Sequence, residues 1–287
     1  MPPLAVHRSR SQIPDFKLLR PRDLAEACAM LVADPKLVPF AGGIDLVNRM
    51  KEGTAPARLM LLSGIAGLGT IRHAVADHAL EIGAMARHDD VATSEAVRTQ
   101  LPDLAACWDR IANIRIRMQG TVAGNLLAGM PGYEGSVLLS ALGASLSYWR
   151  DGALAVAAVS ELPGRDGAER LSGLVTSVRV PLPAPGVTRH LVYDRSLRPA
   201  LSVALQFDRA GDRVIAARAV LGGCHDWPVT RELTLQGSAK VAGLADDIAQ
   251  QAFKDMAPMT VPWFGSPRYR ERVAPVVLAR LLREAMR

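Results

Sequence analysis

The chain has 287 residues, of which 49% are hydrophobic and 22% charged, with 34 Lys and Arg against 28 Asp and Glu. This length suits about two domains, and the ordinary composition excludes disorder beyond the first dozen residues. The net charge of +6 is scattered and aromatic residues make up only 5%, which excludes the basic, aromatic-rich stripe of a nucleic-acid-binding protein.

A strand–helix–strand pattern opens the chain. The strands are predicted at FKLLR (16–20), KLVPF (36–40) and RLMLLSG (58–64). A helix is predicted over 21–34, where Leu24, Ala27, Cys28 and Leu31 share one face and a proline stands near the start. The turn AGGIDL (41–46) directly follows the second strand, a usual place for a bound ligand.

From about Gly69 the pattern changes to short alternating or β-branched runs separated by turn residues. Strands are predicted at TIRHAV (70–75), ALEIGAM (79–85), SLSYWR (145–150), ALAVAAV (153–159) and LVTSVRVPL (174–182). Helical spacing covers 94–116, and 134–144 forms one further helix. This second block is interpreted as an antiparallel sheet with helices packed on it.

The segment PLPAPG (181–186) is a predicted linker, because three prolines and a glycine in six residues cannot continue a strand or helix. Beyond it, strands are predicted at 190–196, 200–208 and 213–223, and helices at 244–256 and 267–286. A C-terminal unit of three strands and two helices is therefore expected.

Several sites are excluded by spacing. No P-loop, GxGxxG, HExxH or GxSxG signature occurs. The six histidines form no metal-ligand spacing and are interpreted as surface or loop residues; they are His7, His73, His78, His88, His190 and His225. Cys28, Cys107 and Cys224 form no CxxC pair, and the first two are expected to be buried thiols. No catalytic residue and no metal site is predicted.

No secretory apolar region and no run of eighteen apolar residues occurs. The sequence therefore predicts a cytoplasmic protein without an integral membrane segment.

Two glycine-rich turns carry the ligand prediction. In AGGIDL, Gly42 and Gly43 allow backbone N–H groups to converge on a diphosphate, although a tight strand-to-helix turn is an equal alternative. In MQGTVAGNLLAGMPGYEG (118–135), the segment Thr121–Asn125 offers a hydroxyl, small residues and a side-chain amide, although it could be an irregular surface loop. Two uncharged turns together favour a large dinucleotide held by backbone.

These blocks resemble a known family. AGGIDL followed by Met50–Lys51, then LEIGAMARHDDVATSEAV, IRIRMQGTVAGNLLAG and LVTSVRVPLP, are similar to the FAD-binding medium subunit of the molybdenum hydroxylases. That family includes the carbon monoxide dehydrogenase medium chain and the central domain of xanthine dehydrogenase. The blocks match in order from about Phe16 to Pro183, and WFGSPRYRERVAPVVLARLL resembles the family's closing helix.

The resemblance implies an α+β fold: a two-subdomain FAD-binding fold of the vanillyl-alcohol-oxidase type, then a smaller C-terminal domain with a three-stranded antiparallel sheet and helices. The FAD-binding domain is expected over 1–183, with subdomains of about 1–65 and 66–183, and the C-terminal domain over 187–287. FAD would lie between the two subdomains. The residues implied for FAD are Ala41, Gly42, Gly43, Ile44, Asp45, Leu46, Thr121, Val122, Ala123, Gly124, Asn125, Glu134, Val175, Arg195 and Arg198.

The resemblance also implies partners. A small subunit would carry [2Fe–2S] clusters and a large subunit molybdopterin, in a dimer of heterotrimers. Electrons released by hydroxylation at molybdopterin would pass through the clusters to FAD, then to NAD, oxygen or another acceptor.

Three positions depart from the family pattern. Ala123 replaces a glycine in the family's TIGGN, Met130 stands where an acidic residue is common, and Glu134 stands at a second such position with a longer side chain that changes its reach. Glu134 can still accept hydrogen bonds from sugar or ribityl hydroxyls, whereas Met130 cannot. The alternatives are a flavin-free scaffold subunit of the same assembly and a stand-alone flavin oxidoreductase.

Overall fold

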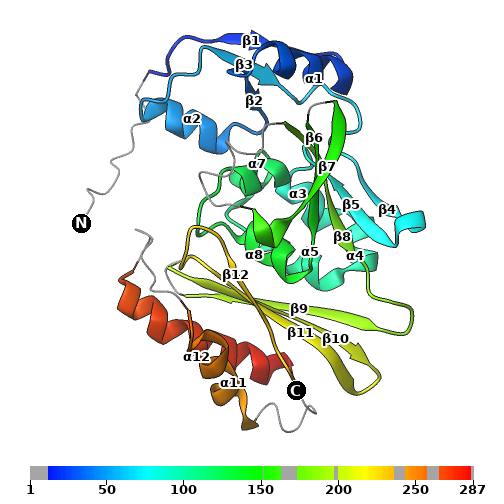
Figure 1. The fold of residues 1–287 in the computed structure, drawn as a ribbon, viewed down its shortest axis with the longest axis vertical. Coiled ribbons are helices and arrows are strands. Elements are labelled where there is room, and N and C mark those ends of the chain that lie inside the picture. Colours follow the sequence, from blue (N-terminus) through cyan, green and yellow to red (C-terminus); the bar gives the residue numbers. More distant parts are fainter. Residues whose placement is uncertain are drawn as a thin grey trace.

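Three β-sheets follow one another along the long axis of the molecule in the computed structural model (Figure 1). The structure describes residues 12–150, 152–162, 173–196, 200–235, 243–256 and 265–285. Within this part of the chain, no helix is both long enough and apolar enough to cross a membrane.

The first sheet is parallel, in the order β1-β3-β2. Its unit contains β1 (Lys17–Leu19), α1 (Leu24–Ala33), β2 (Val38–Phe40), α2 (Ile44–Lys51) and β3 (Arg58–Leu61). Asp23 caps α1 by accepting a hydrogen bond from the Glu26 N–H at 2.8 Å, and the helix buries Ala27 and Cys28 against the sheet. The predicted strand–helix–strand pattern is confirmed.

The middle sheet is antiparallel, in the order β4-β5-β8-β6-β7. Its strands are β4 (Ile71–Ala74), β5 (Ala79–Gly83), β6 (Ser145–Arg150), β7 (Ala153–Ala158) and β8 (Leu174–Pro181), with single 3-10 turns at η1 (Val75–Asp77) and η2 (Val159–Glu161). Six helices lie between β5 and β6 in the chain: α3 (His88–Thr93), α4 (Glu95–Gln100), α5 (Pro102–Asp109), α6 (Ile114–Arg117), α7 (Val122–Leu127) and α8 (Glu134–Ala141).

The helical spacing predicted over 94–116 is divided among α4, α5 and α6. Pro102 starts α5 because it has no N–H to donate within a continuous helix. Asn113 caps α6 and accepts a hydrogen bond from the Ile116 N–H at 3.2 Å. The predicted helical spacing of this segment is confirmed, and the structure divides it into three helices.

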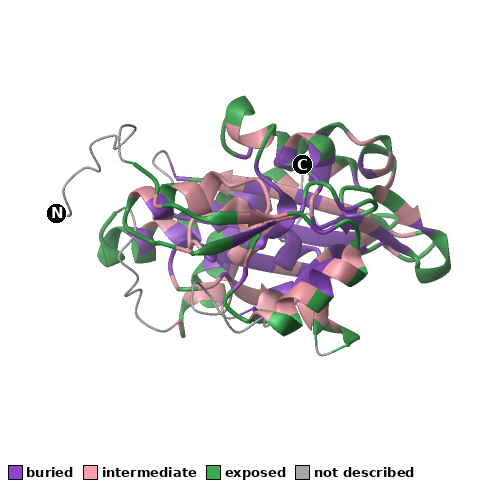
Figure 2. Ribbon diagram, turned by 90° about the horizontal axis from the view of Figure 1, so that it is seen from above, coloured by how far each residue is buried: buried purple, intermediate pink, exposed green. Residues whose placement is uncertain are grey.

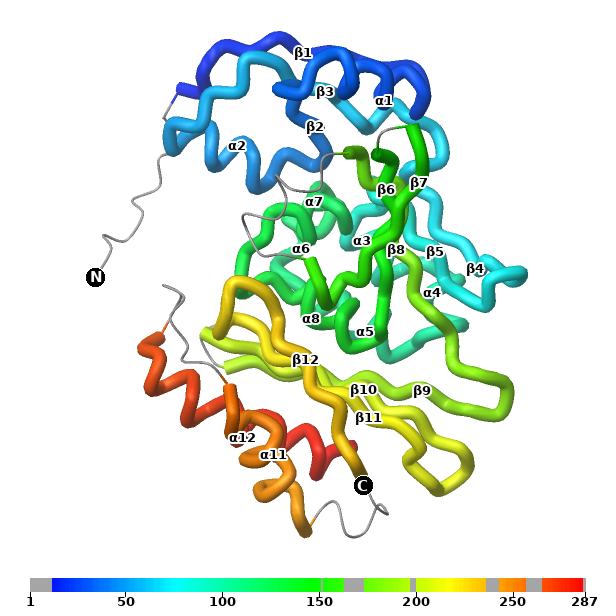
Figure 3. Tube along the Cα trace, viewed as in Figure 1, coloured from blue at the N-terminus to red at the C-terminus, as the bar shows by residue number. Residues whose placement is uncertain are grey.

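The C-terminal sheet has four antiparallel strands, not the three predicted, in the order β12-β11-β10-β9. They are β9 (Thr188–Arg195), β10 (Ser202–Ala210), β11 (Arg213–Gly222) and β12 (Val229–Glu232), followed by α11 (Ala245–Phe253) and α12 (Pro267–Ala285). The four residues of β12 read VTRE and have no buried position, so they lack the apolar alternation that identified the other strands. Figure 3 traces the turn from β8 to β9, through the predicted linker.

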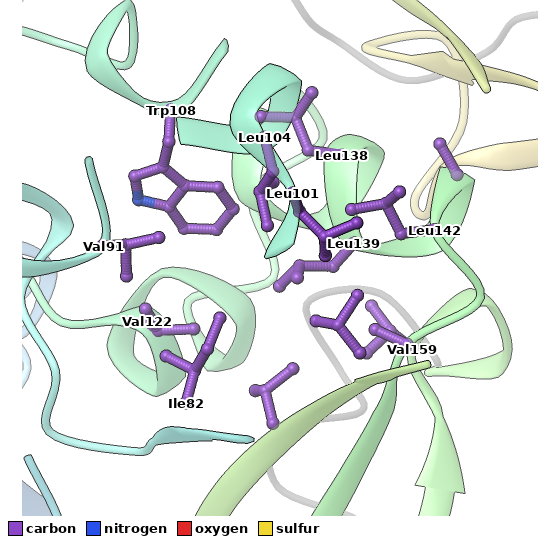
Figure 4. Close-up of a cluster of buried hydrophobic side chains, with 14 of the residues drawn as sticks. Ile82, Val91, Leu101, Leu104, Trp108, Val122, Leu138, Leu139, Leu142 and Val159 are labelled. Carbon is purple, nitrogen blue, oxygen red and sulfur yellow. The ribbon is translucent and has the colours of Figure 1, made fainter. Parts of the chain in front are cut away.

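The C-terminal sheet is covered on both faces. One face packs with α5 and α8 in the largest core, and the other packs against α11 and α12. As a result, seven consecutive residues of β10 from Ser202 are buried. Figure 2 shows the buried residues in the interior of the molecule and exposed residues around its outside. Figure 4 shows the largest core around the indole of Trp108, with Ile82, Val122 and Leu139 nearby.

Candidate functional site

A cleft of about 250 Å³ lies between the N-terminal unit and the middle unit. It is formed by β2, the turn before α2 and α2 itself, the residues that follow β5, the strand β8, and the helices α3, α6, α7 and α8. In Figure 1, α2 faces α7 across this region. Most of the residues predicted from the sequence line it: Ala41, Gly42, Gly43, Ile44, Asp45, Leu46, Thr121, Ala123, Gly124, Asn125, Glu134 and Val175.

The two glycine-rich turns touch at the cleft. A Cβ added to Gly42 would lie 2.1 Å from the Gln119 carbonyl oxygen and 3.2 Å from the Gly120 Cα. Only a glycine permits such a close approach of two backbones. The turn of the N-terminal unit is therefore fixed directly against the turn of the middle unit.

The turn at residues 41–46 carries free backbone donors. Gly43 is the N-cap of α2 and has a φ of 74°, a left-handed conformation that glycine adopts without strain. Within the described part of the chain, no group accepts a hydrogen bond from the N–H groups of residues 41–46. These donors, at the positive end of the α2 dipole, suit an anionic group.

The second turn is the capped start of α7, not an irregular loop. The Thr121 Oγ1 accepts a hydrogen bond from the Gly124 N–H at 3.1 Å. The Val122 and Ala123 N–H groups donate to the Ala86 and Ala84 carbonyls at 2.9 and 3.1 Å, and the Asn125 N–H donates to the Thr121 carbonyl at 2.9 Å. The backbone donors of residues 122–125 are therefore already bonded. From the sequence, we expected the backbone of both turns to bind the ligand, and the structure differs from this at the second turn.

Side chains remain available on this second turn. Asn125 lines the cleft, and its Oδ1 is buried against Gly135 without a hydrogen-bond partner among the described residues. The Thr121 hydroxyl accepts one bond as the cap and keeps its proton to donate.

Two ion pairs stand at the edge of the cleft. The Glu134 carboxylate, 12% exposed, accepts a hydrogen bond from Arg195 Nη1 at 2.7 Å through Oε1. Arg49, which the sequence reasoning missed, also lines the cleft and pairs with Asp45 at 2.9 Å. Its spacing of four residues from Asp45 on α2 was the available signal.

Some predicted site residues do not reach the cleft. The Val122 side chain is fully buried in the core (Figure 4). Arg195 is absent from the lining and approaches the cleft only through Glu134. Met130 is also outside the lining, and Arg198 lies outside the described residues.

His88, predicted to be a surface or loop residue, is buried at the start of α3 and lines the cleft. Burial, with a smaller effect of the Arg117 cation, lowers the pKa of its imidazole to about 4. The surface interpretation was therefore wrong for this histidine. The three cysteines are buried free thiols, as expected for Cys28 and Cys107.

Comparison with known families now identifies the chain. A family model described as "FAD binding domain in molybdopterin dehydrogenase" matches residues 14–183, more than half of the chain. The chain belongs to this family. The family resemblance of its motifs is thus confirmed, and residues 14–183 form an FAD-binding domain.

Members of the family match along nearly the whole chain. The glyceraldehyde dehydrogenase medium chain of Sulfolobus acidocaldarius is 26% identical over 282 residues, covering 94% of this chain and 98% of the relative. The carbon monoxide dehydrogenase medium chain of Afipia carboxidovorans is 29% identical over 282 residues, covering 94% and 96%. The structure of quinoline 2-oxidoreductase from Pseudomonas putida 86 matches with a TM-score of 0.84 at 22% identity, covering 96% of this chain and 98% of that one. This last match confirms the α+β fold.

Proposed function

We propose that this chain is the FAD-carrying electron-transfer subunit of a multi-subunit molybdenum hydroxylase. One observation carries the proposal: residues 41–46, whose N–H groups are unbonded, line the same cleft as Thr121 and Asn125 of the second turn. Unbonded backbone donors suit a polar ligand, and these residues belong to a domain of an FAD-binding family.

The residues present fit FAD. The N–H groups of residues 41–46 would hold the diphosphate without a countercharge, since they combine converging donors with the positive end of α2. Thr121 and Asn125 would contact oxygens from the opposite wall. The apolar side chains of Val175, Leu174 and Leu62 in the lining would contact flat ring surfaces.

Glu134 would accept hydrogen bonds from ribityl or ribose hydroxyls. Arg195 holds one of its oxygens at 2.7 Å, and within the described part of the chain Oε2 has no hydrogen-bond partner. Arg195 would act by fixing the carboxylate.

The partners and the acceptor are part of the proposal. FAD, when bound, supplies the capacity to accept electrons and release them to another acceptor. Electrons would arrive from [2Fe–2S] clusters of a small subunit, supplied by a large molybdopterin-binding subunit. They would leave to NAD, oxygen or another acceptor, in a cytoplasmic dimer of heterotrimers. The relatives named as medium chains support membership in such an assembly.

Purification of the natively expressed protein tests this function. The expected material is larger than the 30.7 kDa chain, shows flavin absorption, releases FAD on denaturation, and contains molybdenum and iron in fixed ratio to flavin. A complex with metals but no flavin would indicate the scaffold alternative. A lone chain that contains FAD and oxidises a substrate by itself would indicate a stand-alone flavin oxidoreductase.

A further inference from the structure

His88 is a buried polar side chain in the wall of the cleft. It is 2% exposed, and its Nδ1 accepts a hydrogen bond from the Trp108 Nε1–H at 3.2 Å. Within the described part of the chain, no group is hydrogen-bonded to Nε2. One ring nitrogen is therefore fixed by the core, while the other is left for a ligand.

The Trp108 bond determines which nitrogen of His88 carries the proton. An indole N–H can only donate, so Nδ1 must be unprotonated to accept from it. A neutral imidazole carries one proton, and that proton is consequently on Nε2. Burial and the Arg117 guanidinium, the charged group that acts on the ring from α6, both disfavour a second proton. His88 is thus a neutral donor with a fixed tautomer.

The ring lies where the two turns meet. The His88 N–H donates to the Gly120 carbonyl at 3.0 Å, and a Cβ on Gly120 would lie 3.0 Å from Cδ2 and 3.3 Å from Nε2. Gly42 packs against Gln119 and the Cα of Gly120. Nε2 therefore lies beside the junction of the two turns, and His88 lines the same cleft as residues 41–46.

We infer that His88 is a cofactor-binding residue whose Nε2–H donates a hydrogen bond to an oxygen of the dinucleotide at the Gly42–Gly120 junction, with Trp108 as the positioning residue that fixes the tautomer. This inference rests on the proposed function, because it needs a dinucleotide in the cleft. His88 would supply the dinucleotide with a hydrogen-bond donor from the middle unit, where the first backbone N–H groups of α7 are already bonded.

Two matched substitutions separate the roles of the two ring nitrogens. His88→Gln places an amide donor near the position of Nε2 but leaves the Trp108 N–H without an acceptor. His88→Asn keeps an acceptor near the position of Nδ1 but removes the donor. FAD affinity of the full chain, measured by quenching of flavin fluorescence, and the melting temperature of the flavin-free protein are compared for both variants.

The two variants are expected to differ in opposite ways in melting temperature and in FAD affinity. His88→Asn retains the melting temperature and binds FAD about tenfold to a hundredfold more weakly, since a hydrogen bond between a neutral donor and a charged oxygen is lost. His88→Gln has a lower melting temperature but keeps an affinity within about threefold. Wild-type affinity in a folded His88→Asn variant, or equal losses in both variants, would overturn the inference and leave the proposed function standing.

A measurement on the wild-type chain covers the case in which a variant does not fold. Nitrogen-15 NMR of labelled histidine should show a protonated Nε2 and an unprotonated Nδ1, and the Nε2 resonance should shift when FAD is added. In Trp108→Phe the Nδ1 tautomer should become populated. An Nε2 signal unaffected by bound FAD would overturn the inference, whereas a wild-type chain that binds no FAD would overturn the proposed function as well.

Discussion

Substitution of Gly42 by alanine tests the contact between the two turns. The new Cβ would lie 2.1 Å from the Gln119 carbonyl oxygen, whereas real Cβ atoms do not approach closer than 3.0 Å. The neighbouring atom is backbone, so no side-chain rotation can relieve the contact. The turns must therefore separate by about 0.9 Å, from 2.1 to 3.0 Å.

The size of the effect follows from that separation. Overpacking that forces a backbone shift usually costs about 1–3 kcal/mol of folding stability. The same shift moves the donors of residues 41–46 away from the Thr121 wall, so hydrogen bonds from one turn or the other to a shared ligand are lost. Loss of one or two such bonds to a charged group corresponds to a weakening of FAD binding of about tenfold or more.

Denaturant unfolding of the flavin-free chain and FAD titration measure the two effects. Gly64→Ala is the matched control, because an added Cβ there meets nothing within 4 Å; it should change stability by less than about 0.5 kcal/mol. A Gly42→Ala variant with the stability and FAD affinity of the control would refute the contact between the turns.

Three further substitutions and a pH series test other parts of the site. Thr121→Val removes the cap that accepts the Gly124 N–H and should cost about 0.5–2 kcal/mol in denaturant unfolding; an unchanged stability would contradict the cap. Glu134→Ala should weaken FAD binding more than Arg195→Ala, because the arginine acts only through the carboxylate, and equal titration curves would argue against direct contact by Glu134. For His88, the pKa is about 4 in the folded chain and about 6.5 when unfolded. The unfolded state therefore binds the proton more readily, and stability should fall by about 3 kcal/mol as the pH drops from 6.5 to 4. A wild-type pH profile parallel to that of His88→Asn would refute the shift.

Local chemistry in the sequence was enough to predict most of the fold. Alternating residues identified the strands of the middle sheet, and the proline-rich segment at 181–186 marked the passage from β8 to the C-terminal sheet. The strand β12 was not predicted, because its partly exposed residues lack the alternation of apolar and polar side chains. Its position is set by pairing with β11, a tertiary contact that no local pattern reports.

Most residues of the candidate site were predicted from the sequence, but the role of each residue in the site was not. Glycines and small polar residues marked both turns, yet nothing local showed that Gly42 packs on Gln119, 77 positions later in the chain. His88 was interpreted as a surface or loop residue because the six histidines are dispersed and form no metal-ligand spacing. Its burial depends on Trp108 and Gly120, which the tertiary fold brings to it.

Ala123 is relevant to the alternative that this chain is a scaffold subunit that binds no flavin. The family's glycine at this position suggests a close backbone approach to the ligand, so a methyl group there could exclude FAD. However, the Ala123 N–H already donates to the Ala84 carbonyl at 3.1 Å, and therefore no backbone donor to the ligand is lost by the change. The change therefore adds only one methyl group to the lining of the cleft. This methyl group lies opposite the turn at residues 41–46, whose N–H groups are unbonded. The steric effect of Ala123 is thus the only argument this position offers against FAD, and it leaves the donors of residues 41–46 and the Asn125 side chain intact.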